Sequence, residues 1–362
     1  MLTTPPRHRV IFYCPEPKQA VGGVSVIYQF AATLRDHGVE AFVLHPTKGY
    51  VYPSVEVSPS IQYSDDAAFT TSDIFVIPEI FGPSWAELVS PAKFVVLNQN
   101  AFLTFNQWEL DETRSEGFTH VYEHPNLLAV VCVSSSNRRY VRTICDLAPM
   151  LQLTYGAEAI SSVHKFRDRE LSIAYMPRKR SGDSSQVLQL LALWGELNDV
   201  QVHRIDGMSP TAVRETLAHT AIFLNFAEME GFSLPILEAM AAGCLVIGYD
   251  GSGGADALSN RTGYPIPYGD TLAFAQSTRK ALTAIRKGRF RSIERRVERA
   301  SKLMRSERTI ERREESMLAI WSEIEKLAVA ELSGDEEQPL SIDFTKLKTY
   351  ARAKRAANGS QV

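Results

Sequence analysis

The feature that most limits how this chain can fold is a series of short apolar runs separated by segments of helical periodicity. The first five runs lie at residues 9–14, 39–46, 73–79, 93–99 and 127–134. Between the first two, segment 25–38 places Ile27, Phe30 and Leu34 on one helical stripe and ends in Gly38, a common helix stop. Apolar strands that alternate with helices favour a parallel sheet with helices on both faces.

The same pattern begins again in the second half of the chain. Strands are expected at residues 170–177, 200–206, 221–226 and 244–250, with a helix at 233–243. A length of 362 residues favours two domains over one. We therefore expect doubly wound α/β domains over residues 1–160 and 161–305, with ligands bound in the cleft outside the carboxyl ends of the strands.

Composition excludes several classes of protein. The net charge of −3 gives no electrostatic reason to expect nucleic acid as the main partner. The four cysteines form no CxxC pair, and the histidines have no metal-ligand spacing, so we expect reduced thiols, a cytoplasmic location and no metal. The sequence has no apolar signal core and no run near the roughly 20 residues that span a bilayer.

The most informative motif is EMEGFSLPILEAMAAGCLVIGYD, residues 228–250. Ser233 is a suitable N-cap and Pro235 is tolerated in a first turn, so a helix is expected from about Leu234. Its free N–H groups would form an anion site. Glu230 in the preceding loop and Glu238 in the helix would add carboxylates, which suit hydroxyl groups. A nucleotide sugar carries both a diphosphate and hydroxyl groups.

Each acid also has an ordinary structural explanation. Glu238 near a helix start would favour the helix dipole, and Glu230 could be a solvated loop residue. The combination of two acids, Gly231, a helix start and a following apolar strand is less easily explained in that way, because Gly231 lets a ligand approach the backbone closely.

The stretch EGFSLPILEAMAAGCLVIG resembles the E-x7-E signature of retaining GT-B glycosyltransferases of family 4. The resemblance implies two Rossmann-like domains facing a cleft and a nucleoside-diphosphate sugar as donor, with no cofactor and no metal ion. It implies that Glu230 contacts the donor sugar and that Glu238 contacts the ribose. The donor would also lie near the backbone of Gly231, Phe232, Ser233 and Leu234.

Two further segments match the family approximately. Gly22 and Gly23 resemble its glycine-rich loop after the first strand, which faces the diphosphate. Arg178 and Lys179 follow the first strand of the second domain, where the family carries an arginine and a lysine that clamp the pyrophosphate, and Arg180 competes with them for this role.

Two other segments depart from the family. Many members have a histidine after the strand at 93–99, where this chain has Asn98, Gln99 and Asn100. Amides can hydrogen-bond an acceptor or donor hydroxyl, but they cannot act as a general acid or base near neutral pH. We therefore expect Asn100 at the reaction centre and Asn98 and Gln99 as weaker sugar contacts. In the loop at 248–260, Ala255–Asp256 replaces the usual proline–glutamate pair.

The end of the chain is highly charged. Segment 306–330 resembles the family's C-terminal helix, which crosses back onto the N-terminal domain, and residues 331–362 are expected to form a polar tail. Within this tail, the basic segment 344–356 suggests a peripheral contact with anionic lipid at the inner face of a membrane.

The sequence thus predicts a retaining, metal-independent glycosyltransferase that moves a hexose to a glycan or lipid-linked acceptor in polysaccharide or cell-envelope synthesis. Two alternatives remain. A nucleotide-sugar epimerase shares the fold and the diphosphate site, but it is not expected to carry the E-x7-E arrangement. A non-catalytic partner of a glycosyltransferase complex would explain the missing histidine, but it has no need to retain Glu230 and Glu238.

Overall fold

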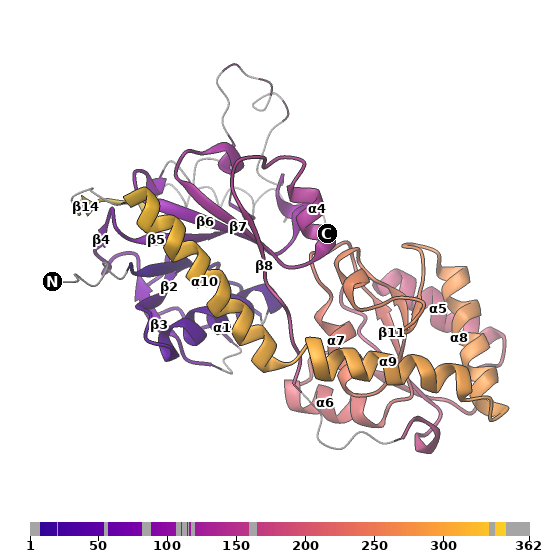
Figure 1. Ribbon diagram of the computed structural model, residues 1–362. Coiled ribbons are helices and arrows are strands. Elements are labelled where there is room, and N and C mark those ends of the chain that lie inside the picture. Colours follow the sequence, from indigo (N-terminus) through magenta and orange to yellow (C-terminus); the bar gives the residue numbers. More distant parts are fainter. Residues whose placement is uncertain are drawn as a thin grey trace. The chain divides into compact units, whose positions relative to one another are not determined.

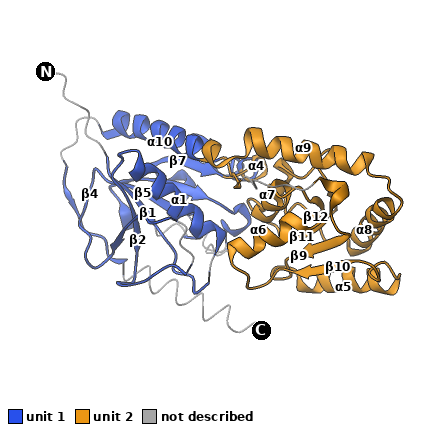
Figure 2. Cartoon of the chain, turned by 90° about the horizontal axis from the view of Figure 1, so that it is seen from below, with its two compact units in different colours: residues 1–132, 138–153, 314–362 blue, residues 133–137, 154–313 orange. Residues whose placement is uncertain are grey.

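The computed structural model divides into two compact units. It describes residues 8–19, 21–53, 57–81, 88–105, 110, 114, 116, 120–158, 165–332 and 337–344. Unit 1 comprises residues 1–132, 138–153 and 314–362, and unit 2 comprises residues 133–137 and 154–313 (Figure 2). Helices α4 (Ser135–Val141) and α10 (Ile310–Leu332) have residues in both units.

Unit 1 contains a seven-stranded parallel sheet in the order β3-β2-β1-β5-β6-β7-β8 (Figure 1). The strands are β1 (Val10–Tyr13), β2 (Ala41–His45), β3 (Ser60–Tyr63), β5 (Ile74–Pro78), β6 (Lys93–Asn98), β7 (Leu127–Cys132) and β8 (Met150–Gln152). The chain passes outward from β1 to β3 and returns to β5 on the other side of β1. The strand order therefore reverses between β1 and β5, and we call this place the switch point of unit 1.

The first helix follows the predicted pattern. Helix α1 (Gly22–Asp36) buries Ile27, Phe30 and Leu34, and Gly38 beyond it has φ +82°, a conformation that favours glycine. Unit 1 also contains the short 3-10 helices η1 (Ala101–Leu103) and η2 (Val121–Glu123).

Unit 2 contains a five-stranded parallel sheet in the order β10-β9-β11-β12-β13. The strands are β9 (Ser172–Tyr175), β10 (Gln201–Arg204), β11 (Ile222–Phe226), β12 (Leu245–Tyr249) and β13 (Tyr264–Pro265). The helical segments are η3 (Phe166–Asp168), α5 (Ser181–Leu193), α6 (Pro210–His219), α7 (Leu234–Ala241), η4 (Gly253–Asp256), α8 (Thr271–Arg286) and α9 (Arg291–Glu307). The order reverses between β9 and β11, which is the switch point of unit 2. Two parallel, doubly wound sheets confirm the α/β fold class that the sequence predicted.

The C-terminal part of the chain is more ordered than a polar tail implies. Helix α10 buries Met317, Trp321 and Ile324 on unit 1. Strand β14 (Pro339–Leu340) then pairs antiparallel with β4 (Phe69–Thr70). Phe344, the first residue of the predicted lipid-contact segment, is 6% exposed and lies in the core cluster of unit 1, and the rest of that segment lies outside the described residues.

Among the described residues, no helix is both long and apolar enough to span a bilayer. The same part of the chain contains no group of three or more histidine, cysteine, aspartate or glutamate side chains arranged to hold a metal ion.

Candidate donor site

Helix α7 begins where the sequence predicts. Leu234 is the first helical residue, Pro235 lies in the first turn and Ser233 is the N-cap residue, with extended backbone dihedral angles. The Ser233 side chain, however, makes no N-cap hydrogen bond. Its Oγ is buried, lies 3.4 Å from Nδ2 of Asn225 and hydrogen-bonds the carboxyl of Glu230. The Ser233 hydroxyl therefore stabilises the loop before α7 and not the first turn of the helix.

Glu230 is fixed by its backbone to the loop after β12. Its N–H donates to the carbonyl of Gly251 at 2.9 Å, and its carbonyl accepts from the N–H of Gly253 at 3.2 Å. A Cβ at position 253 would lie 1.8 Å from the Gly231 carbonyl oxygen, so only glycine fits there. Between these bonds, Ser252 has φ +71°, the one positive φ among the described non-glycine residues. Such a conformation costs roughly 1–3 kcal/mol and persists where the surroundings impose it.

The carboxylate of Glu230 forms an ion pair with Lys179. Lys179 follows β9 and Glu230 follows β11, so the pair lies at the switch point of unit 2. The Glu230 side chain is 14% exposed. Burial raises the pKa of this carboxyl above its ordinary value, while the Lys179 ammonium and the Ser233 hydroxyl oppose that shift.

The three basic residues after β9 have different surroundings. Lys179 pairs with Glu230. Arg180 is held by Asp183, 2.8 Å from its guanidinium, and packs 4.8 Å from the centre of the Tyr268 ring. Arg178 is exposed on the same turn. Lys179 and Arg180 are therefore each paired with a carboxylate, and Arg178 lies exposed beside them.

The remaining residues of the motif divide into packing and site residues. Phe232 is 6% exposed, packs edge-on against Tyr155 at 5.2 Å and lies 5.4 Å from the Arg308 guanidinium, so its side chain belongs to the core of unit 2. Leu234 and Glu238 are half-buried and lie four residues apart on α7, so they share one face of the helix. The Glu238 side chain tilts toward the start of α7.

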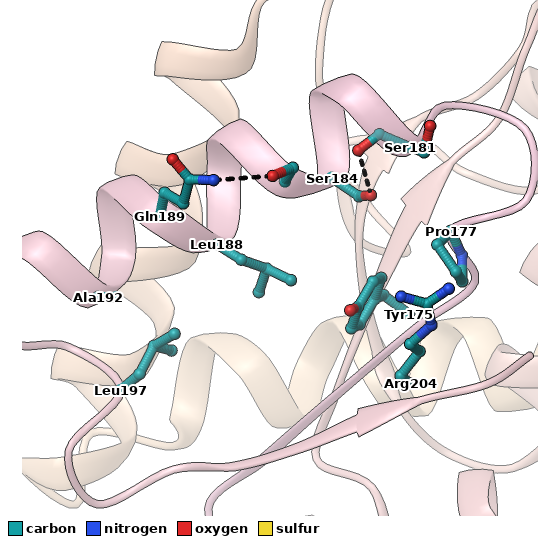
Figure 3. A pocket seen from close by; sticks show the side chains of 10 residues that line it. Tyr175, Pro177, Ser181, Ser184, Leu188, Gln189, Ala192, Leu197 and Arg204 are labelled. Atoms are coloured by element: carbon teal, nitrogen blue, oxygen red, sulfur yellow. Dashed lines mark hydrogen bonds between the residues drawn. The ribbon is translucent and has the colours of Figure 1, made fainter.

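A cavity of about 390 Å³ borders the same turn (Figure 3). It lies between α5 and the strands β9 and β10. Tyr175 and Arg204 form one wall, and Ser181 and Leu188 of α5 form the opposite wall (Figure 3). Pro177 and Ser181, which flank Arg178 and Lys179 in the sequence, both line it.

The predicted glycine-rich loop of unit 1 is instead the start of a helix. Gly22 and Gly23 are the first two residues of α1, after the extended residue Val21. The Gln99 side-chain amide donates to the Gly23 carbonyl at 3.0 Å. A Cβ on Gly23 would lie 3.4 Å from that amide nitrogen, which is ordinary van der Waals contact, so the contact with Gln99 does not itself require glycine.

The structure contradicts the predicted sugar contact of Asn98. Its side chain is fully buried at the end of β6, where Nδ2 donates to the Thr104 hydroxyl at 2.9 Å and to the Tyr122 hydroxyl at 2.7 Å. Strand β6 is covered on both faces, so its last side chain turns into the core. Asn100 caps η1 by accepting from the Phe102 N–H at 3.1 Å, which gives its side-chain oxygen a local structural role.

The chain is similar in sequence to known glycosyltransferases. The family model for glycosyl transferases group 1 matches residues 147–284, a range that contains Lys179, Glu230 and Glu238. An alpha-1,6-glucosyltransferase from Actinobacillus pleuropneumoniae serotype 7 is 27% identical over 287 residues, which cover 75% of this chain and 83% of that protein.

Solved structures show the same fold. Sucrose-phosphate synthase from Thermosynechococcus elongatus has a TM-score of 0.60 at 11% identity, over 88% of this chain and all of that one. HepE from Anabaena, in complex with UDP and glucose, has a TM-score of 0.59 at 11% identity, over 87% of this chain and all of that one. The chain is a glycosyltransferase with the GT-B fold.

Glu79 was not among the candidate site residues predicted from the sequence. Glu79 directly follows β5, is 7% exposed and accepts the Gln99 backbone N–H at 3.0 Å. Burial raises its pKa to about 7. The available signal was a single acid at the end of the apolar run 73–79, at the edge of the sheet where ligands bind.

Proposed function

We propose that this glycosyltransferase moves a hexose from a nucleoside-diphosphate sugar to a hydroxyl group of a glycan or lipid-linked acceptor, with retention of configuration and without a metal ion. The observation that carries the proposal is the Lys179–Glu230 ion pair at the switch point of unit 2, beside the start of α7. Parallel α/β sheets bind ligands at such a point.

The donor diphosphate would meet two sources of positive charge. Lys179 and Arg178 supply cationic side chains, and the start of α7 supplies the positive end of a helix dipole. Both would stabilise the charge that develops on the departing diphosphate, which is the task a metal ion performs in other enzymes. The departing phosphate then takes the proton of the acceptor hydroxyl, and the enzyme's main contribution is positioning.

The carboxylates would hold the hydroxyl groups of the donor. Glu230 would accept from the hexose, and its contact with Lys179 keeps the carboxylate next to the diphosphate. Glu238, near the start of α7, would accept from the ribose. The adjoining cavity of about 390 Å³ is large enough for the nucleobase, with the Tyr175 ring and the Arg204 guanidinium as flat surfaces for stacking.

Glucose and UDP are the first donor components to test. The relative named alpha-1,6-glucosyltransferase supports glucose as the sugar. The complex of HepE with UDP and glucose shares the fold and supports the same pair. The four cysteines are free and buried, in line with a cytoplasmic enzyme that supplies polysaccharide or cell-envelope synthesis.

The test is transfer from UDP-glucose to a panel of glucosides and glucose-containing lipid-linked glycans, with NMR of the product. We expect an α-linked product from the α-linked donor, unaffected by EDTA. Glu230→Gln should lower kcat at least 100-fold with an unchanged melting temperature, because one catalytic contact is typically worth about 3 kcal/mol. A β-linked product would refute retention, and full activity of Glu230→Gln would refute the site.

A further inference from the structure

The switch point of unit 1 holds a buried acid that the proposed donor chemistry does not use. Glu79 follows β5, Gly23 lies in the helix that follows β1, and Gln99 follows β6. Because β1, β5 and β6 are neighbouring parallel strands, their carboxyl ends lie along one edge of the sheet. This is the position that Lys179 and Glu230 occupy in unit 2.

Hydrogen bonds connect these residues in a chain. The Glu79 carboxylate accepts the Gln99 backbone N–H at 3.0 Å, and it also interacts with the N–H of Asn100. The Gln99 side-chain amide donates to the Gly23 carbonyl at 3.0 Å. The carboxylate therefore holds the turn after β6, and that turn holds the first residues of α1.

Among the described residues, the groups that favour the ionised form of Glu79 are backbone N–H groups, whereas Lys179 has this effect at Glu230. Burial raises the pKa of Glu79 to about 7 against the effect of those N–H groups. The titratable side chains that face Glu79 in the described part of the chain are Tyr122 of η2 and Cys132 at the end of β7. Burial raises the pKa of Tyr122 far above neutral and that of Cys132 to about 12, so both are uncharged near pH 7.

The charges at the switch point of unit 1 determine which kind of ligand can bind there. A buried carboxylate repels a phosphate, whereas the Gln99 amide suits neutral hydroxyl groups. An acceptor sugar presents such hydroxyl groups, while the donor diphosphate matches the cations of unit 2.

We propose that Glu79 is a positioning residue for the acceptor, whose ionised carboxylate holds Gln99 and the start of α1 in the arrangement that binds an acceptor sugar hydroxyl. Protonation of Glu79 weakens the bonds to the turn and releases Gln99. The assignment to the acceptor rests on the proposed function, whereas the control of Gln99 by Glu79 does not.

The first measurement tests the hydrogen bonds among Glu79, Gln99 and Gly23 and does not depend on enzymatic activity. Protein labelled with ¹⁵N-glutamine is titrated from pH 5.5 to 8.5, and the Gln99 signals are assigned by their loss in Gln99→Ala. We expect the backbone and side-chain signals of Gln99 to titrate with a midpoint near 7 in the wild type and not in Glu79→Gln. Signals that do not titrate in the wild type, or that titrate equally in Glu79→Gln, would overturn the proposal.

The second measurement compares kcat/KM for the acceptor with KM for UDP-glucose across the same range. A single ionisation near 7 lowers kcat/KM about tenfold from pH 8 to pH 6. We expect this fall in the wild type and a flat profile in Glu79→Gln, with an unchanged KM for UDP-glucose. An acid limb that survives in Glu79→Gln would refute the acceptor role. Absence of any transfer by the wild type would instead refute the proposed function, and the Gln99 signals would still decide the role of Glu79.

Asp73 provides a matched control, because it is a buried acid at the other end of β5. It is 1% exposed and pairs with Arg9 at 2.7 Å. Asp73→Asn should lower the melting temperature but keep the wild-type pH profile and the titration of Gln99. If Asp73→Asn flattened the profile as Glu79→Gln does, the effect would be one of general stability and the positioning role would be refuted.

Discussion

Two glutamates of this glycosyltransferase, Glu230 and Glu79, differ in the groups that surround their carboxylates. Glu79 directly follows β5 and is 7% exposed, and Glu230 lies in the loop after β11 with its side chain 14% exposed. Glu230 faces Lys179, which stabilises its charge, while Glu79 faces backbone N–H groups and neutral side chains. Burial raises the pKa of both carboxyls, and the shift is opposed by a cation at Glu230 and by backbone N–H groups at Glu79.

The raised pKa of Glu79 has a consequence for stability. A carboxyl whose pKa is about 7 in the folded chain and 4.5 when exposed stabilises the fold fully below pH 4.5 and loses that contribution as pH rises through 7. The full loss is about 3 kcal/mol. The free energy of unfolding of the wild type relative to Glu79→Gln should therefore fall by up to this amount between pH 5 and 8.

Urea unfolding at a series of pH values measures this difference. The control is the same series for Asp73→Asn, whose difference from the wild type should not fall over this range. A wild-type advantage over Glu79→Gln that rises with pH would show that the carboxyl is stabilised in its ionised form, contrary to the account.

The sequence predicted some of these residues and not others, for physical reasons. Glu230, Glu238 and the start of α7 follow from local spacing, because a helix start is a local structure. The partner of Glu230 could not be chosen among three consecutive basic residues, because the choice depends on the contacts of β11 with β9. Asn98 was predicted wrongly because the direction of a strand's last side chain depends on what covers the sheet.

At the scale of elements, the carboxyl-terminal end of α7 is held by an arginine. Arg169 donates to the carbonyl of Thr220 at 2.5 Å and to that of Ala242, so it satisfies the ends of both α6 and α7. A cation at the carboxyl end of a helix is also favoured by the helix dipole. Arg169 therefore fixes the orientation of the helix whose N-terminus faces the proposed donor.

Replacement of Arg169 should affect stability more than any neighbouring charge. Arg169→Ala removes the guanidinium that donates to the carbonyls of Thr220 and Ala242 and should cost about 2 kcal/mol or more. Arg167, two residues earlier, is exposed and pairs with Glu294 on the surface. Arg167→Ala should leave the melting temperature unchanged. Calorimetry measures the melting temperature of both variants. An equal decrease in the two would show that Arg169 has no special role at the helix ends.

For the molecule as a whole, long-range order was the least predictable feature. The alternation of strands and helices established two parallel sheets, because this pattern extends along the whole chain. The attachment of β14 to β4 and of Phe344 to the core of unit 1 was not predicted, because a two-residue strand and one aromatic residue give no periodic signal. The polar, charged sequence after α10 therefore gave no sign that β14 and Phe344 attach it to unit 1.

The two switch points carry different kinds of side chains, and these match the two substrates of the proposed reaction. Unit 2 combines cations, a helix start and two carboxylates, as a nucleoside-diphosphate sugar requires. Unit 1 combines a buried carboxylate with neutral amides, as a hydroxyl-bearing acceptor requires. The central claim of the account is that the donor binds at the switch point of unit 2.

Isothermal titration of UDP into the wild type and into Lys179→Ala tests that claim most directly. We expect one UDP per chain, with affinity lowered at least tenfold in Lys179→Ala, because a charge-assisted contact with phosphate is typically worth more than about 1.4 kcal/mol. Arg180→Ala, whose cation is held by Asp183, should bind UDP with close to wild-type affinity. Equal affinity of the wild type and Lys179→Ala for UDP would contradict the placement of the donor.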